Sequence, residues 1–292
     1  MSYGFNKSTA ALGWKCFLCT VGQVVHTLPE GETVAGVTSL GDELFLLREK
    51  ERDQIEVYDV ITYRLRRCIT VPYICGLVDM TSCAYFHCVY IADYIVTSIH
   101  RVDVYWGVTT HWAVNDMPDG LSVTKAHNVL VTCDVVHKIK EFSSHGVLLR
   151  EMTLPGGVIN LWHAIQLPSG QCVVCHGSGS DADNRVCVMS AECTHIVHTH
   201  GGRPGSDIGQ YNVPIRLAVD DNGFVFVADM CNRRVTLLSP TLNYTCQVVS
   251  SDKLKWEPCR LHLDVQRRRL YVADNEWKDD EWTSGRVVVF SV

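Results

Sequence analysis

The sequence lacks any long apolar run. Nowhere in its 292 residues is there a stretch close to the roughly eighteen apolar residues that a membrane-spanning helix needs. The first residues, MSYGFNKSTAALGWK, also lack a basic region followed by an apolar core, so they do not resemble a secretory leader. These two absences argue against a membrane or secreted protein, and we expect the chain in the cytoplasm.

Signatures of nucleophilic and nucleotide chemistry are missing as well. The chain contains no G-x-S-x-G elbow and no G-x-x-x-x-G-K-[ST] loop. Paired carboxylates such as Asp220/Asp221 and Asp279/Asp280 fall in predicted turns, without apolar surroundings that would raise a pKa. The sequence therefore predicts a protein that is not an enzyme and that uses no cofactor.

What the sequence does contain is an internal repeat. A basic or amide residue followed by a β-branched residue recurs at Gln54-Ile55, Arg101-Val102, Lys138-Ile139, Arg185-Val186, Arg234-Val235 and Arg286-Val287. A second marker, which closes a short apolar run, precedes each pair at Glu49, Asp93, Asp134, His176, Asp229 and Asp274. Repeats of roughly 40 to 50 residues are typical of solenoids, arrays and propellers.

The clearest unit, residues 211–249, decides among these folds. It contains four segments rich in β-branched and aromatic residues, at 215–219, 224–228, 234–238 and 244–249. Four strands per unit and no helical periodicity favour an all-β, six-bladed β-propeller of four-stranded antiparallel blades over a helical solenoid. We expect a lead at residues 1–20 and a single propeller domain at residues 21–292.

The last unit supplies three strands before the chain ends, so its blade needs a fourth. Residues 23–28, near the start of the chain, have the composition of a strand and precede the first complete unit. We expect this segment to join the last blade, because a closed ring leaves no exposed sheet edge.

The fifth unit allows a resemblance to be named. The segment GGRPGSDIGQYNVPIRLAVDDNGFVFVADMCNRRV resembles an NHL repeat, with matches at Gly201, Gly202, Gly205, Gly209, Pro214, Val219, Asp220, Gly223, Val227, Ala228, Asp229, Asn232, Arg234 and Val235. The sixth unit, RLHLDVQRRRLYVADNEW with GRVVVF, is nearly as similar, and the first four units match less well. The resemblance covers about residues 36–292 and is specific for the fold.

The repeated residues have a structural explanation. An Asp at the end of the second strand can accept hydrogen bonds from turn amides, and the following Arg can pair with that carboxylate. Because every blade carries a version of the set, we interpret it as what builds a blade and not as a catalytic ring.

The NHL resemblance implies several functions. The family includes the C-terminal propellers of tripartite-motif (TRIM-NHL) ubiquitin ligases, free-standing NHL proteins and peptidyl-hydroxyglycine amidating lyases. In the ligases the activity belongs to a RING domain before the propeller, and no RING fits before the first unit here. The favoured function is a non-enzymatic protein-interaction scaffold, such as the substrate-recruiting part of a ligase of the ubiquitin pathway. An RNA-binding propeller and a metal-dependent lyase are the alternatives.

The fourteen cysteines invite a metal or haem interpretation. Cys172-Val-Val-Cys175-His176 matches the c-type haem attachment motif. Alignment of the units places it on a strand, however, where the two sulfur atoms point to opposite faces. We expect free thiols, with Cys83 and Cys88 placed to pair across a turn only under oxidising conditions.

Three histidines are candidate metal ligands for the lyase alternative. His163 and His262 fall on predicted inner strands, where they align with Leu217 and Ala218, one position apart. Neighbouring positions on a strand face opposite ways, which argues against a shared metal. His176 is the third candidate, near one mouth of the channel.

Partner binding is expected on one face of the propeller, named here the top face. It carries the entries to the inner strands and the turns between the second and third strands. Tryptophan and arginine are enriched in binding hot spots. The candidate binding residues are Trp162, Arg216, Arg260, Trp256, Arg233, Tyr94, Glu276, Trp277 and Trp282. Alignment of the units places Trp162, Arg216 and Arg260 at one register, and we expect an irregular turn at residues 275–284.

Charge favours a protein or peptide partner over RNA. The net charge is −6, whereas nucleic-acid binding is typical of a basic face. The basic clusters at residues 64–67 and 267–269 lie on an outer strand and a bottom-face turn, away from the candidates. The expected partner is a protein or peptide of basic character, bound by a monomer that contacts no membrane.

Overall fold

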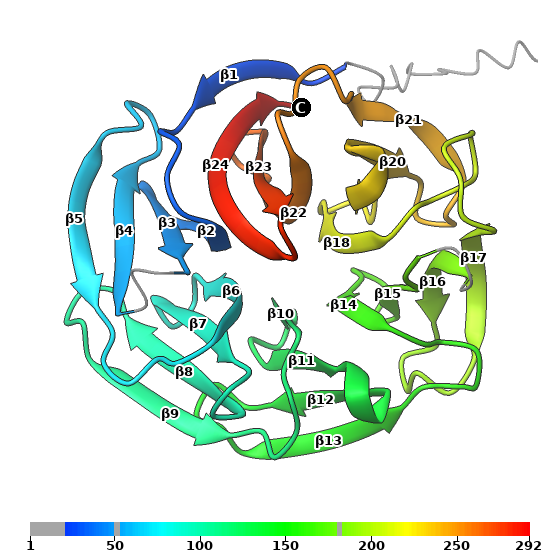
Figure 1. Ribbon diagram of the computed structural model, residues 1–292. Coiled ribbons are helices and arrows are strands. Elements are labelled where there is room, and N and C mark those ends of the chain that lie inside the picture. Colours follow the sequence, from blue (N-terminus) through cyan, green and yellow to red (C-terminus); the bar gives the residue numbers. More distant parts are fainter. Residues whose placement is uncertain (1–20, 50–52, 180–182) are drawn as a thin grey trace, which may run out of the picture.

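The computed structural model describes residues 21–49, 53–179 and 183–292. Within these ranges the strands form six four-stranded antiparallel sheets. The sheets surround a central axis as the blades of a propeller, with the first strand of each blade innermost (Figure 1). The predicted all-β, six-bladed fold is confirmed. The lead predicted for residues 1–20 lies outside the described residues.

The first three blades follow one another in chain order, from the inner to the outer strand. Blade one contains β2 (Val34–Leu40), β3 (Glu43–Arg48), β4 (Gln54–Asp59) and β5 (Leu65–Thr70). Blade two contains β6 (Leu77–Cys83), β7 (Cys88–Asp93), β8 (Ser98–Asp103) and β9 (Thr109–Ala113). Blade three contains β10 (Gly120–Val123), β11 (Val129–Cys133), the 3-10 turn η1 (Asp134–Val136), β12 (Lys138–Phe142) and β13 (Leu148–Thr153).

The other three blades repeat this order. Blade four contains β14 (Leu161–Gln166), β15 (Cys172–His176), β16 (Asn184–Met189) and β17 (Ile196–Gly202). Blade five contains β18 (Pro214–Val219), β19 (Val225–Asp229), the 3-10 turn η2 (Met230–Asn232), β20 (Arg234–Leu238) and β21 (Tyr244–Val249). Blade six contains β22 (Glu257–Asp264), β23 (Arg269–Lys278), β24 (Glu281–Ser291) and β1 (Gln23–Thr27).

The ring closes through the amino-terminal strand, as predicted. β1 pairs antiparallel with β24, with Gln23 opposite Ser291 and Thr27 opposite Val288. The pairing continues beyond β1, because the Leu28 amide donates to the Val287 carbonyl at 2.9 Å. Both ends of the described chain therefore contribute to blade six, and a rupture there would open the ring.

The repeated carboxylates tie strands together within blades five and six. Asp229 accepts hydrogen bonds from the Asn212 amide and the Arg234 guanidinium, both at 2.7 Å. Asp274 repeats the pattern in blade six, where the Lys255 amide donates at 2.7 Å and Arg286 forms an ion pair at 3.1 Å. Each Asp thus ties the segment entering the inner strand to the third strand. The explanation of the repeat as a structural device agrees with these contacts.

The core lies between neighbouring blades. One cluster, for example, joins Leu44 and Leu46 of blade one to Tyr271 and Val289 of blade six. Burial of such surfaces contributes about 25 cal/mol per Å² of apolar area. The Cys172–His176 segment belongs to this buried layer, on β15, where the alignment of the units placed it. The described part of the chain contains no helix long and apolar enough to cross a bilayer.

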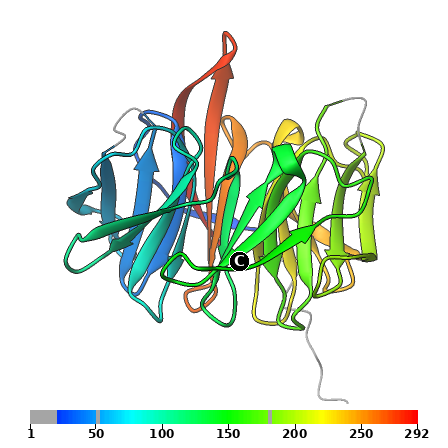
Figure 2. The same ribbon diagram turned by 90° about the horizontal axis from the view of Figure 1, so that it is seen from below.

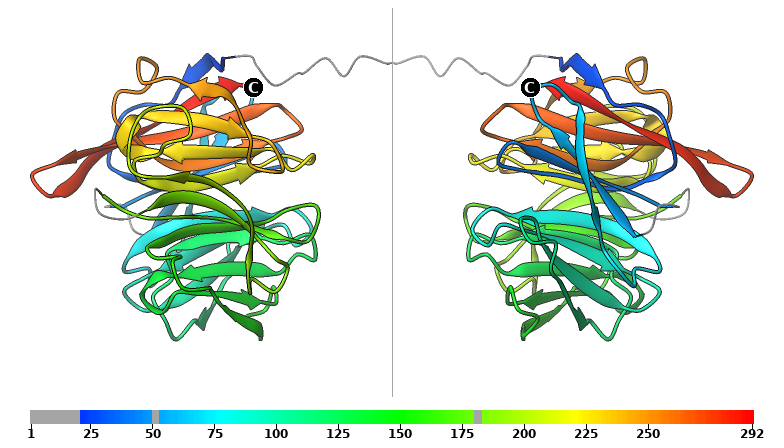
Figure 3. Two further views of the ribbon diagram at one scale, coloured as in Figure 1. Left: turned by 90° about the vertical axis from the view of Figure 1, so that its right-hand side faces the viewer. Right: turned by 90° about the vertical axis from the view of Figure 1, so that its left-hand side faces the viewer.

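Blade six carries a long two-stranded arm. β23 and β24 stay paired from Arg269 and Ser291 at the base to Lys278 and Glu281 at the tip. The arm rises above the top face of the disc (Figures 2 and 3). The expected irregular turn at residues 275–284 is therefore wrong. Both tip residues, Asp279 and Asp280, have positive φ, at 53° and 64°, and a tight two-residue turn of this kind lets the hairpin continue.

Candidate functional site in the central channel

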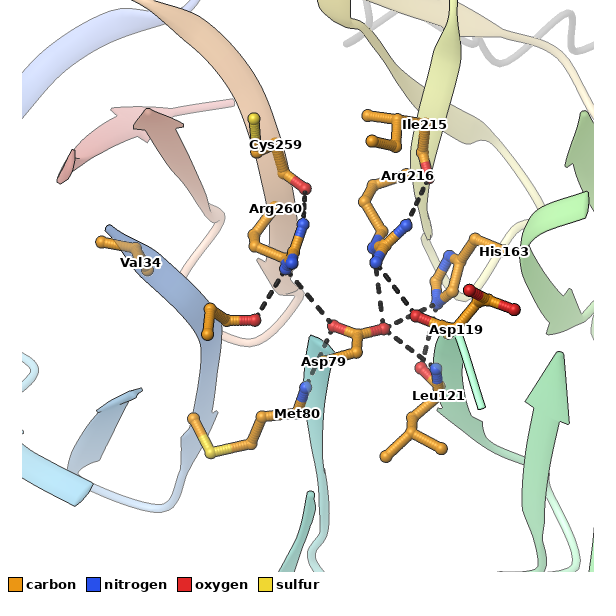
Figure 4. Close-up of polar contacts among 12 residues, drawn as sticks. Val34, Asp79, Met80, Asp119, Leu121, His163, Ile215, Arg216, Cys259 and Arg260 are labelled. Carbon is orange, nitrogen blue, oxygen red and sulfur yellow. Dashed lines mark hydrogen bonds and ion pairs between the residues drawn. The ribbon is translucent and has the colours of Figure 1, made fainter. Parts of the chain in front are cut away.

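Each of the six inner strands places one residue at the same register of the central channel. This position pairs with a residue near the carboxyl end of the apolar run of the second strand, and in five blades it directly follows a β-bulge. The residues at this register, named here the channel ring, are Gly36, Asp79, Gly120, His163, Arg216 and Arg260. Two of these residues are glycines, and the other four have charged or polar side chains that converge on the axis (Figure 4).

The register of blade four differs from the prediction. His163 pairs with Cys175, as Arg216 pairs with Ala228, so His163 and not Trp162 is the counterpart of Arg216. Trp162 falls on the bulge, and its indole Nε1 donates to the Gly177 carbonyl at 2.8 Å. A shift of one residue moves a side chain to the other face of a strand. The prediction that Trp162 shares a ring with the two arginines is therefore wrong.

Asp79 is the centre of the ring. The residue is 5% exposed, and its carboxylate accepts the backbone N–H groups of Met80 at 3.0 Å and Leu121 at 2.9 Å. The two arginines face it from the opposite side, with Arg216 Nε 3.7 Å and Arg260 Nε 4.0 Å from its oxygens (Figure 4). Asp79 thus bridges blades two and three and lies against blades five and six.

Both arginines are held by backbone carbonyls. Arg216 donates from Nη1 to Ile215 at 2.9 Å and from Nη2 to the Asp119 carbonyl at 3.1 Å. Arg260 donates from Nε to Ala35 and from Nη1 to Cys259, both at 2.7 Å. Burial and the neighbouring guanidinium of Arg216 lower the pKa of Arg260 to about 10, so Arg260 remains charged at neutral pH.

His163 is neutral in this environment. Its Nδ1 accepts the Leu217 N–H at 3.2 Å, which leaves Nε2 protonated and donating to the Leu121 carbonyl at 2.9 Å. Burial lowers its pKa to about 4, against the opposing effect of Asp79. Both ring nitrogens are therefore occupied by protein contacts.

The other two candidate metal ligands are engaged elsewhere. His262 Nε2 accepts the Ser39 amide at 3.0 Å, and burial lowers the pKa of this histidine to about 4. His176 lies at the end of β15, with Nε2 3.5 Å from the Cys187 sulfur. His262 lies two positions after Arg260, which shares the register of His163. The two histidines are therefore two register positions apart, and the predicted offset of one position is wrong. Within the described ranges, no group of three or more His, Cys, Asp or Glu residues is placed to hold a metal.

A cavity of about 230 Å³ adjoins the ring. Asp79, His163 and Arg216 lie at its inner end. Its walls follow the inner strands toward their carboxyl ends, away from the arm, with apolar residues such as Leu121 and Ile165. The cavity therefore lies on the side of the ring that leads to the bottom face.

The remaining candidate residues lie apart from the channel ring. Tyr94 is in the β7–β8 turn, Arg233 follows η2, and Trp256 precedes β22 under the ammonium of Lys255, 4.2 Å from its ring centroid. Glu276, Trp277 and Trp282 belong to the arm. The role of all these residues in binding stays a prediction.

Asp79 and the two ring glycines are not among the candidate residues that the sequence indicates. A Cβ at Gly120 would lie 2.6 Å from the Trp162 carbonyl, and one at Gly36 would lie 2.5 Å from the Met80 Cβ, so the ring has no room for side chains there. Alignment of the five bulged inner strands on their bulges would have placed Asp79 at the register of the two arginines. The stronger repeat markers all lie on the second and third strands.

No protein-family model matches the chain. No curated protein matches it either. Among solved structures it is similar to a streptogramin B lyase, with 11% identity, a TM-score of 0.62 and coverage of 91% of this chain and 88% of the other. Virginiamycin B lyase from Staphylococcus aureus gives 8% identity, a TM-score of 0.60 and coverage of 90% and 98%. A protein of unknown function from Bacteroides caccae has 15% identity and a TM-score of 0.58, and the match covers 78% of this chain and 85% of the other.

At these identities the likeness shows the fold alone. It supports a six-bladed propeller, whereas membership of the NHL family stays a prediction. The prediction that the chain is not an enzyme is corrected, because two of the three propellers are described as lyases. The absence of familiar catalytic motifs was an insufficient reason to exclude catalysis from this fold.

Proposed function

We propose that the top face binds a protein or peptide of basic character, with the arm of blade six as the principal contact. The observation that carries the proposal is the projection of the arm beyond the disc (Figure 2). Trp277 near its tip is 52% exposed, and its ring packs edge-on against Trp282, with centroids 4.9 Å apart. An exposed indole ring packed against a half-buried one is the kind of anchor that forms binding hot spots.

The charge of the arm supports a basic partner. Around the tryptophans lie four carboxylates and one ammonium group: Glu276, Asp279, Asp280, Glu281 and Lys278. An acidic surface attracts a partner rich in lysine and arginine and orients it before contact. The apolar rings then provide the buried area.

Exposed apolar side chains on the same face extend the proposed surface. Ile95 in the β7–β8 turn is 53% exposed, Val135 in η1 is 69% exposed, and Ile208 before β18 is 77% exposed. Tyr94 adds a ring that is 37% exposed. A partner anchored on the arm could cover these side chains without entering the channel.

A peptide library displayed on phage tests the proposal. We expect selection on the wild-type protein to enrich peptides rich in Lys and Arg, and Trp277→Ala to weaken their binding at least tenfold. The matched control is Trp106→Ala, which removes an 83% exposed tryptophan from the β8–β9 turn on the opposite face. Equal loss from both variants, or enrichment of acidic peptides, would remove the arm as the site.

A lyase activity is the second candidate. It is favoured by Asp119, whose carboxyl pKa burial raises to about 6, beside the channel ring. A group that titrates near neutrality suits general acid or base catalysis. The test is incubation with a streptogramin B antibiotic, followed by chromatography, with Asp119→Asn as the comparison. An unchanged antibiotic after prolonged incubation would reject this substrate.

A further inference from the structure

The cavity beside the channel ring has the features of a second binding site. We infer that it holds a small organic carboxylate, with the charged end at Arg216 and the apolar end between the inner strands. This site is separate from the proposed surface on the top face, because the cavity extends toward the opposite side of the ring.

The charges of the ring are the first support. Two guanidinium groups, Arg216 and Arg260, face the single ring carboxylate of Asp79. His163 adds no charge, since both of its nitrogens hold backbone groups. The backbone carbonyl of Asp119 accepts a hydrogen bond from Arg216, while the carboxylate of Asp119 accepts the Asp134 N–H at 2.8 Å. Among the six ring residues the guanidinium groups therefore outnumber the carboxylates by one, which favours an anionic ligand.

An unsatisfied hydrogen-bond donor, the Nε–H of Arg216, is the second support. Arg216 is 3% exposed, and its Nε has no hydrogen-bond partner. The nearest Asp79 oxygen is 3.7 Å away, beyond hydrogen-bond distance. A buried donor without a partner costs about 1–3 kcal/mol, so a native structure normally supplies one. An incoming carboxylate oxygen would satisfy the Arg216 Nε–H.

The size and lining of the cavity define the ligand. A volume of about 230 Å³ is below the range of about 300–1,000 Å³ typical of sites for drug-sized molecules. Leu121, Ile165 and Leu217 supply apolar walls, and the hydroxyl-bearing side chains of Thr81 and Ser122 lie among them. These dimensions suit an acid with a short aliphatic chain and exclude a nucleotide.

Isothermal titration with acetate, butyrate and hexanoate tests the inference. We expect butyrate to bind at least tenfold more tightly than acetate, because its chain fills the apolar part of the cavity. Butyramide and butylamine are the controls for charge, and both should bind at least tenfold more weakly than butyrate. Binding of the amide or the amine as tightly as the acid would overturn the assignment, and so would no binding of any of the acids.

A cavity-filling variant locates the site. Thr81→Leu adds apolar volume inside the cavity without removing a ring charge, and we expect it to weaken butyrate binding at least tenfold. The matched control, Thr70→Leu, makes the same change on the exposed outer strand of blade one and should leave binding unchanged. Equal binding by wild type and Thr81→Leu would overturn the location. Since both variants keep the arm, failure here is distinguishable from failure of peptide binding.

Discussion

Replacement of Asp79 by alanine should destabilise the whole propeller. The substitution removes the carboxylate that faces Arg216 and Arg260, and leaves the Leu121 N–H without its acceptor at 2.9 Å. Breaking a buried ion pair by removing one partner costs about 3–5 kcal/mol, because the remaining charge stays buried and uncompensated. For a chain of this size we expect a fall in melting temperature of roughly 6–20 °C.

Urea unfolding, followed by tryptophan fluorescence, measures this loss as a lower midpoint at an unchanged slope. Asp79→Asn separates the contribution of the charge from that of the hydrogen bonds. The amide oxygen of Asn can still accept a backbone N–H, but the negative charge is gone. The matched control is Asp42→Ala, which removes an exposed carboxylate paired with Arg267 at 2.5 Å and should change the midpoint little. A loss below about 1 kcal/mol for Asp79→Ala would refute the reasoning that the carboxylate compensates the buried arginines.

Three further predictions concern the closure, the repeat and the channel histidines. Deletion of residues 1–27 removes β1 and should broaden or abolish cooperative thermal unfolding, whereas deletion of residues 1–20 removes none of the described contacts; equal melting curves would contradict closure through β1. Asp229→Ala should lose about 3–5 kcal/mol in urea unfolding, and the exposed control Asp221→Ala should lose little. The pKa of His262 is about 4 in the fold and about 6.5 unfolded, so the unfolded chain binds the extra proton and stability falls as pH falls between these values. His262→Gln should remove about 2 kcal/mol of the stability difference between pH 7 and pH 5, and an unchanged difference would show that His262 does not titrate this way.

The blades could be predicted from the sequence because their signals are local. Alternating apolar residues and the polar residue that closes each second strand, an Asp in four of the six units, recur along the chain, so the six sheets and the closing strand follow from them. The extended arm was not predicted, because its strand pairing has no such local signal. Trp277 and Trp282 gain their strand pairing only from each other across the tip, and the acidic residues between them are typical of an irregular turn.

The candidate site was only partly predictable. Arg216 and Arg260 were selected as a pair, but as residues of the top face; the structure buries Arg216 in the channel. His163 was discounted as a partner of His262, since a one-residue error in register reverses the face of a strand. Asp79 carries no repeat signal, and nothing in its local sequence distinguishes it from an acidic residue on an exposed strand.

The sequence by itself determined the number of blades, their strand order and the closure, because each depends on contacts within one repeat or between neighbouring repeats. Only the tertiary structure decided what the centre of the molecule contains. The bulge in five of the six inner strands selects which residue faces the axis, and closure of the ring then brings Asp79, Arg216 and Arg260 together from distant blades. Because a meeting at the axis depends on all six blades at once, no single repeat contains the information that defines it.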